Sequence, residues 1–114
     1  MKNFRFKNDK YKKNRGGASK LLLLSCTSCK QQICFYQKDG PGPLKRLYFD
    51  RILDSDSVYT ETATDLNNIP QLLCSNCECV LGIPIIYEKE NRKAYRLFVG
   101  AISKKTMKNV NNLE

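Results

Sequence analysis

Two C-x2-C motifs are the strongest constraint on how this chain folds. Cys26 and Cys29 form the first motif, Cys74 and Cys77 form the second, and residues 30–73 lie between them. Each motif presents two sulfurs from one short turn, and four thiolates suit a tetrahedral Zn²⁺ ion with Zn–S distances of about 2.3 Å. Because four cysteines leave no coordination position for water, we expect one structural zinc ion rather than a catalytic one.

Other uses of the thiols agree less well with the sequence. Nothing marks the chain for secretion, and a reducing cytosol disfavours disulfides. Bacterial ferredoxins hold iron–sulfur clusters with a close run of cysteines rather than two separated pairs, and unligated thiols are the remaining alternative. Cys79 is an alternative ligand to Cys77, although only Cys77 repeats the spacing of the first motif. Cys34, beside Phe35 and Tyr36, is expected to be a small buried apolar residue.

Several classes of function are disfavoured by what the composition lacks. The chain has no histidine, so Ser-His-Asp and Cys-His nucleophiles and histidine metal ligands are excluded. Acidic residues such as Asp50 with Asp54 or Asp56 are more typical of a solvated loop than of general acid–base catalysis. The longest aliphatic run, residues 21–24, is far shorter than the roughly 20 residues of a membrane helix. We therefore expect a soluble, cytoplasmic protein that is not an enzyme, has no small-molecule substrate and does not enter a membrane.

The stretches between and after the cysteine motifs are typical of strands. Residues 33–37 and 45–53 predict a hairpin around the Gly- and Pro-rich turn at 39–43, and no segment shows a sustained helical period. The sequence therefore predicts a mainly β fold, a small antiparallel domain around the zinc site at residues 21–103, followed by a polar tail at 104–114. The expected strands are residues 33–37, 45–53, 58–59, 80–87 and 94–102.

Positive charge is concentrated at the N-terminus. The net charge is +9, and residues 1–20 contribute +7 of it, with eight basic side chains and one acidic. This arm ends in a Gly-containing stretch at 15–19 and is expected to be disordered and not needed for folding. A solubilising extension would account for the positive charge but not for aromatic residues within it. Phe4, Phe6 and Tyr11 lie among the cations, however, and aromatic rings can stack on unpaired bases while cations neutralise phosphates.

The charge pattern leads to two functional hypotheses. The first is binding to RNA or to a ribonucleoprotein such as the ribosome, and the second is a protein-interaction module without catalytic activity. Phosphate binding weakens steeply with salt, whereas a largely apolar contact does not. A second basic group, Arg92, Lys93, Arg96, Lys104, Lys105 and Lys108, adds only modestly to the case because acidic residues are interspersed. The expected phosphate contacts are Arg5, Lys7, Lys10, Lys12, Lys13, Arg15, Lys38, Lys45, Arg46 and Arg51.

Residues 74–82, preceded by the motif at 26–29 and a β-rich spacer, resemble the zinc-binding β-tent superfamily. This group includes Yippee proteins, the thalidomide-binding domain of cereblon and the RNA-sensing C-terminal domain of certain cytosolic helicases. Its pattern is C-x2-C, a spacer, then C-x2-C-G-x-x-L-G; here Glu78 stands at the first glycine and Ile83 where an aromatic residue is common. The resemblance implies two sheets meeting at a zinc apex. It implies neither the cereblon pocket, which needs tryptophans, nor the activity of the related methionine sulfoxide reductases, which need histidines and a catalytic cysteine motif.

Overall fold

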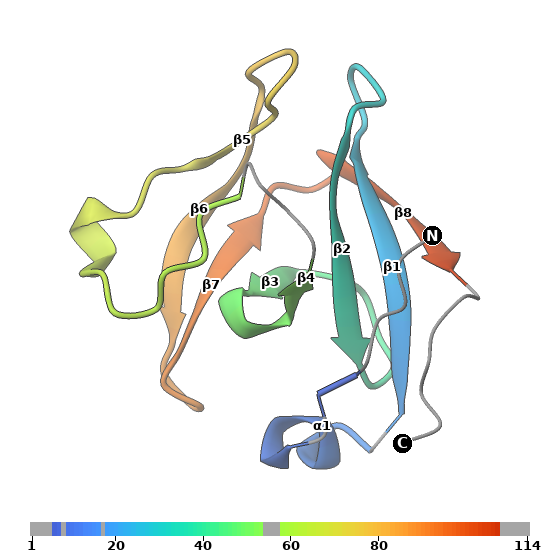
Figure 1. Ribbon diagram of the computed structural model, residues 1–114, viewed down its shortest axis with the longest axis vertical. Coiled ribbons are helices and arrows are strands. Elements are labelled where there is room, and N and C mark those ends of the chain that lie inside the picture. The colour runs from blue at the N-terminus through green and yellow to red at the C-terminus, as the bar shows by residue number, and fades with distance from the viewer. Residues whose placement is uncertain (1–5, 8, 17, 54–57, 108–114) are drawn as a thin grey trace.

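The computed structural model describes residues 6–7, 9–16, 18–53 and 58–107. They form two four-stranded sheets in which neighbouring strands are antiparallel (Figure 1), so the predicted mainly β, two-sheet fold is confirmed. The first sheet, ordered β4-β2-β1-β8, contains β1 (Ser19–Cys26), β2 (Gln32–Asp39), β4 (Ile52–Leu53) and β8 (Ile102–Met107). The second, ordered β3-β7-β6-β5, contains β3 (Arg46–Tyr48), β5 (Leu72–Leu73), β6 (Val80–Tyr87) and β7 (Arg92–Leu97). Short helices are α1 (Lys10–Asn14), η1 (Phe49–Arg51) and η2 (Leu66–Asn68).

The core lies between the two sheets. From Leu22 to the end of β1, the buried Leu22, Leu24 and Cys26 alternate with the less buried Leu23 and Ser25, as expected for a strand with one face in the core. The three buried residues belong to the same core cluster as Phe49 and Tyr95, whose ring centroids are 4.7 Å apart. Burying these apolar side chains is the main driving force that holds the sheets together.

The predicted hairpin of residues 33–37 with 45–53 is wrong for most of its length. β3 pairs with β7 of the second sheet, and only β4 pairs with β2, at Phe35↔Leu53 and Tyr36↔Ile52. The 3₁₀ turn η1 between β3 and β4 carries the chain from one sheet to the other, so this segment belongs to both. Residues 58–59, an expected strand, belong to none.

The N-terminal segment differs from the predicted disordered arm. α1 forms because the Asp9 carboxylate caps it, accepting hydrogen bonds from the backbone N–H groups of Tyr11 at 3.1 Å and Lys12 at 3.2 Å. A helix of five residues is too short to show a hydrophobic period. β1 begins at Ser19, inside the expected arm. Arg5 and Phe4 lie outside the described residues.

The expected polar tail also begins too early, because residues 104–107 belong to β8. This strand pairs with β1 from Cys26↔Ile102 to Leu21↔Met107. Lys104 and Lys105 are exposed, so backbone pairing rather than burial holds them in the sheet, and apolar alternation could not have indicated a strand here. None of the described helices has the length and apolar character needed to cross a membrane.

Candidate metal centre

The first cysteine motif forms a tight turn between β1 and β2. The Cys26 N–H donates to the Gln31 carbonyl at 2.8 Å, and the Lys30 N–H donates to the Cys26 carbonyl at 2.9 Å. Lys30 adopts a left-handed backbone conformation with φ 69°. The turn therefore returns the chain into β2 while leaving the sulfurs of Cys26 and Cys29 on its inner side.

The second motif repeats this hydrogen-bond pattern between β5 and β6. The Cys74 N–H donates to the Cys79 carbonyl at 2.9 Å, and the Glu78 N–H donates to the Cys74 carbonyl at 3.0 Å. Glu78 has φ 64°, matching Lys30 of the first turn. The two motifs are thus structural equivalents at corresponding ends of the two sheets (Figure 1).

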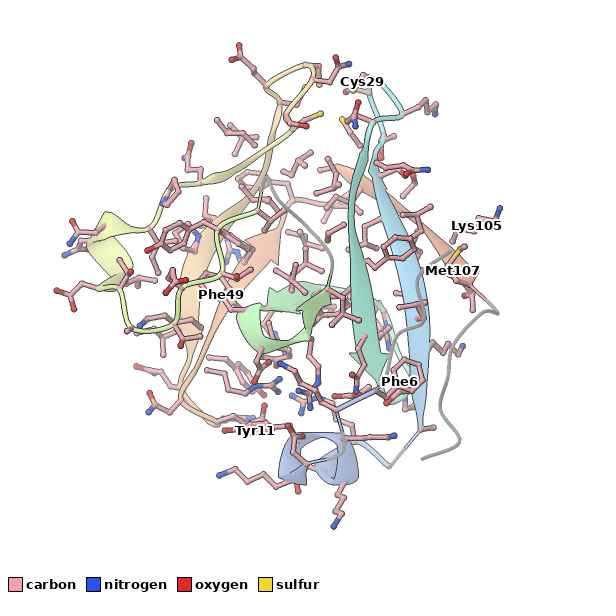
Figure 2. All side chains as sticks on the ribbon, in the orientation of Figure 1. Phe6, Tyr11, Cys29, Phe49, Lys105 and Met107 are labelled. Atoms are coloured by element: carbon pink, nitrogen blue, oxygen red, sulfur yellow. The ribbon has the colours of Figure 1, made fainter. Side chains whose placement is uncertain are left out.

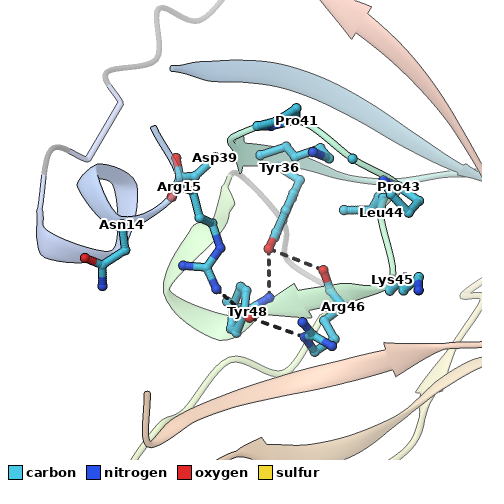
Figure 3. Close-up of a pocket in the computed structure, with 12 residues that line it drawn as sticks. Asn14, Arg15, Tyr36, Asp39, Pro41, Pro43, Leu44, Lys45, Arg46 and Tyr48 are labelled. Carbon is cyan, nitrogen blue, oxygen red and sulfur yellow. Dashed lines mark hydrogen bonds between the residues drawn. The ribbon is translucent and has the colours of Figure 1, made fainter. Parts of the chain in front are cut away.

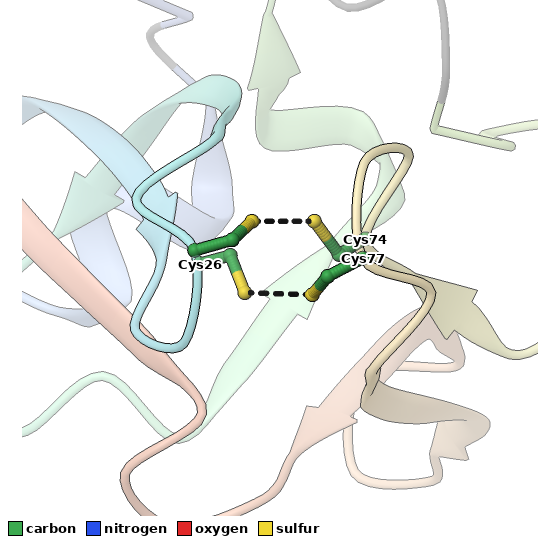
Figure 4. A group of neighbouring side chains, drawn as sticks. Cys26, Cys74 and Cys77 are labelled. Carbon is green, nitrogen blue, oxygen red and sulfur yellow. Dashed lines mark hydrogen bonds between the residues drawn. The ribbon is translucent and has the colours of Figure 1, made fainter.

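The four sulfurs of Cys26, Cys29, Cys74 and Cys77 lie within 4.8 Å of one another. The Sγ atoms of Cys26 and Cys77 are 3.7 Å apart, and those of Cys29 and Cys74 are 3.5 Å apart (Figure 4). A tetrahedron with Zn–S bonds of about 2.3 Å has S···S edges of about 3.8 Å. The sulfur arrangement therefore fits a single four-coordinate metal ion. The four cysteines that form it are the ones that the sequence predicted as ligands.

Hydrogen bonds shift the thiols of this cluster in opposite directions. In Cys77 a hydrogen bond from the Cys79 backbone lowers the pKa, but the hydrogen bonds that its thiol shares with the neighbouring thiols raise the pKa overall. In Cys29 they favour the thiolate. Donation from the Asn76 side chain and from the Gln31 backbone lowers the pKa of the Cys29 thiol to about 6. The backbone N–H of Asn76 also lies 3.4 Å from Cys74 Sγ. Because metal ligands must be deprotonated cysteines, these donors stabilise the form that binds a cation.

The other two cysteines lie outside the group of four. Cys34 is buried on β2, and its burial raises the pKa of the thiol to about 12, which confirms the expected apolar role. Cys79 is exposed, with its Sγ 3.7 Å from Ser28 Oγ. Its contribution to the centre is the backbone carbonyl that closes the second turn, so Cys77 is the residue whose sulfur joins the cluster.

Glu78 and Gly82 occupy the two glycine positions of the superfamily pattern, and the structure gives each a physical reason. The left-handed conformation of Glu78 is one that glycine adopts without steric cost. At Gly82, a Cβ atom would lie 2.7 Å from the Arg96 carbonyl oxygen on β7, so only glycine allows this close approach of the strands.

The arm residues and the expected phosphate contacts lie mainly at the opposite end of the molecule. Figure 2 shows Cys29 at one end and Phe6 and Tyr11 at the other. Here Arg51, 1% exposed, donates from Nη2 to Asp9 at 2.6 Å and from Nε to Asp39 at 2.9 Å. Arg51 is therefore an internal ion-pair residue and is not accessible to a phosphate, which corrects its assignment as a contact.

Arg15, another expected phosphate contact, also forms hydrogen bonds within the protein. Both of its terminal nitrogens donate to the Glu90 carboxylate at 2.9 Å, and Nη2 donates to Tyr48 Oη at 2.9 Å. These bonds join the C-terminal end of α1 to the second sheet. The Lys7 backbone, which exchanges two hydrogen bonds with the Gln37 side chain on β2, joins the same segment to the first sheet.

Sequence reasoning missed the structural role of Arg92, which it grouped with surface cations. Its side chain is 4% exposed and pairs with Asp50 at 2.6 Å and Glu90 at 3.1 Å. The guanidinium also lies over the rings of Tyr11, at 4.0 Å, and Tyr48, at 3.8 Å. Charged residues at alternate positions of a strand do not reveal which faces inward, so the sequence carried no signal for this network.

The remaining expected contacts make no ion pair with any described residue. Lys7, Lys10 and Lys13 are exposed, while Lys12 lies over the Phe6 ring at 5.5 Å. A cavity of about 560 Å³ is bordered by three other expected contacts, Lys38, Lys45 and Arg46. Arg15, Tyr36 and Tyr48 also line it (Figure 3). The structure thus separates the buried arginines from an accessible basic group.

Charge is poorly balanced around this cavity. Burial lowers the pKa of the Lys38 ammonium, and repulsion from Lys104 and Lys20 lowers it further, while Asp39 opposes the shift. The carboxylate of Asp39 is already engaged with Arg51. An anion bound here would therefore relieve repulsion among cations.

Comparison with known proteins found no match to this chain among protein families, curated proteins or solved structures. The β-tent resemblance accordingly rests on the cysteine motifs and the two-sheet arrangement described above. What the chain shares with that superfamily is a small all-β fold with a four-cysteine cluster able to bind a metal.

Proposed function

We propose that this chain is a structural-zinc protein that binds RNA, or an RNA-containing assembly, through its unpaired surface cations. Among metals, zinc suits a closed set of four thiolates in tetrahedral geometry. The single observation that supports RNA binding is the distribution of ion pairs. Asp9, Asp39, Asp50 and Glu90 form the described ion pairs with buried or half-buried arginines. Arg15 borders the cavity and is paired with Glu90, but the other cations that border it, Lys38, Lys45 and Arg46, receive none of these pairs.

The metal's role follows from where the sulfurs lie. Cys26 ends β1 of one sheet, and Cys74 follows β5 of the other, so one ion bonded to both motifs cross-links the two sheets. Elemental analysis of the purified protein should give one zinc per chain, and a chelator should unfold it. Folded protein that contains no zinc would refute this part of the proposal.

The RNA part is tested by the salt dependence of binding. We expect the double variant Lys38→Gln/Lys45→Gln, which changes two cations that border the cavity, to reduce the magnitude of the slope of log affinity against log salt by roughly 1.4 for a single strand, about 0.7 per lost phosphate contact. A matched control, Lys30→Gln/Lys89→Gln, removes the same charge at exposed or half-exposed positions that do not border the cavity.

Equal losses in the two double variants would show that net charge rather than this surface controls binding. No detectable RNA binding at low salt would refute the RNA proposal. In that case an association with proteins that persists at high salt would support the interaction-module alternative.

A further inference from the structure

The turn between β7 and β8 exposes two large apolar side chains beside the basic surface. Phe98 is 42% exposed and Val99 is 106% exposed. An exposed aromatic ring forfeits the free energy that burial would provide, so its position beside cations is informative. The RNA proposal above does not use this turn.

Backbone hydrogen bonds fix this turn in place. The Phe98 N–H donates to the Leu81 carbonyl on β6 at 3.0 Å, and the Ala101 N–H closes the turn on Phe98 at 3.2 Å. Gly100, with φ 79°, supplies the left-handed conformation that the turn requires. The Thr27 N–H, inside the first cysteine motif, donates to the Ala101 carbonyl at 3.0 Å. The ring is therefore presented from a scaffold connected directly to the metal centre.

Phe98 and Val99 border a second cavity, of about 720 Å³, which lies within the range of roughly 300–1,000 Å³ typical of ligand sites. Four cations, Lys45, Arg46, Arg96 and Lys104, also border it, and none of the described residues that line it is acidic.

The arrangement of two of these cations favours an anionic ligand. Arg46 and Arg96 are direct cross-strand partners of β3 and β7, so their side chains leave the same face of the sheet. Like charges placed opposite each other destabilise a sheet. The Arg46 guanidinium lies over the Tyr87 ring at 4.3 Å and donates to Tyr48 Oη at 3.3 Å. Neither guanidinium has an ion pair within the described part of the chain, however, so a bound anion would compensate the repulsion between them.

We infer that Phe98 stacks on an unpaired base, with Arg46, Arg96 and Lys104 on the flanking phosphates, so that the RNA bound is single-stranded at this position. This inference rests on the proposed RNA binding and specifies the form of its ligand. A cationic groove with an exposed aromatic ring provides the two contacts that single strands use, whereas the base faces of a duplex interior are stacked on each other and not free.

The two cavities share one wall, which offers the strand a path along it. Residues 43–46 border both cavities. The Lys45 carbonyl accepts a hydrogen bond from the Leu97 N–H at 3.0 Å, which holds this shared wall against the strand that leads into Phe98. A strand whose base stacks on Phe98 can therefore extend its phosphates toward Lys38.

The test compares a fluorescent single-stranded RNA of mixed sequence with the same RNA annealed to its complement. We expect the zinc-loaded protein to bind the single strand more tightly than the duplex. Phe98→Ala should weaken single-strand binding by about 5- to 150-fold, the loss expected for one base–aromatic stack. The slope against salt should not change, because no phosphate contact is removed. Phe98→Tyr should retain the affinity, and Leu73→Ala, which truncates another exposed apolar side chain away from the cavity, should have no effect.

Each outcome has a defined meaning. Equal affinity for both RNAs, with no effect of Phe98→Ala, would overturn the stacking inference and leave RNA binding by the cations intact. Absence of binding to either RNA would refute the proposed function itself. Polyglutamate binding that competes fully with the single strand and also depends on Phe98 would overturn the inference in favour of an acidic protein partner.

Discussion

The ion pairs of Arg51 allow a sharp test of whether the N-terminal segment is part of the fold. Two carboxylates accept hydrogen bonds from this buried guanidinium: Asp39, with a side chain 4% exposed, and Asp9, 38% exposed; a third, Asp50, lies farther away, at 3.9 Å. We expect Asp39→Asn to destabilise the protein by about 3–5 kcal/mol, the cost of breaking a buried ion pair. Asp9→Asn should have a smaller but still measurable cost, about 0.5–1 kcal/mol, because that pair is partly in water.

The atoms involved explain the difference. Oδ1 of Asp9 accepts from Arg51 Nη2 and from the N–H groups of Tyr11 and Lys12. Asparagine keeps that oxygen and is an equally good helix cap, so Asp9→Asn removes only the charge. In Asp39, Oδ1 accepts from Gln37 and Oδ2 accepts from Arg51 Nε. The amide of Asp39→Asn would retain the first bond and turn an NH₂ group toward the guanidinium, leaving a buried donor unpaired.

Urea unfolding of the zinc-loaded variants, followed by circular dichroism at neutral pH, measures both effects. Hydrogen bonds from Arg51 and Lys12 lower the pKa of Asp9 despite its partial burial. Its contribution is therefore present above the unfolded pKa and lost as the pH falls through the lowered folded value, so wild type and Asp9→Asn should converge in acid. Equal free energies of unfolding for wild type and Asp9→Asn at neutral pH would refute docking of the N-terminal segment. A small effect of Asp39→Asn would refute the buried-pair reasoning.

Three further predictions concern the metal centre. Glu78→Gly should raise the free energy of unfolding by about 1 kcal/mol, because it relieves a left-handed conformation at a non-glycine residue; a destabilised variant would contradict the strain assigned to Glu78. In the zinc-loaded protein, iodoacetamide should label Cys79 and spare Cys34, whose thiol is buried and has a pKa raised to about 12. Mass spectrometry of the peptides measures the labelling, and a labelled Cys34 beside an unlabelled Cys79 would contradict this prediction. Acidification should release zinc as the four thiolates take up protons, at a pH below the pKa of Cys29 in the metal-free protein, about 6, because the bound ion competes with protons for the sulfurs; a metal-sensitive dye that showed complete retention in strong acid would argue against thiolate ligands.

The sequence alone determined which cysteines form the cluster and the β class, because both depend on short-range patterns. A C-x2-C spacing brings two sulfurs to one turn whatever the rest of the chain does, and the repeat of that spacing selected Cys77 over Cys79. The strand at residues 80–87 follows from local β propensity and was predicted with its observed bounds. Propensity does not specify a partner, however, and the segment at 45–53 was paired with the wrong sheet over β3.

Only the tertiary structure decided which charges face water. Arg51 and Arg46 have the same side chain and lie on neighbouring elements, yet the first is buried against two carboxylates and the second borders an accessible cavity. α1 likewise depends on contacts with residues distant in sequence, among them the ion pair of Arg15 with Glu90. Long-range pairing of charges is a property of the assembled sheets, since the free energy of an ion pair depends on its burial and its partners rather than on the residues beside it in the chain.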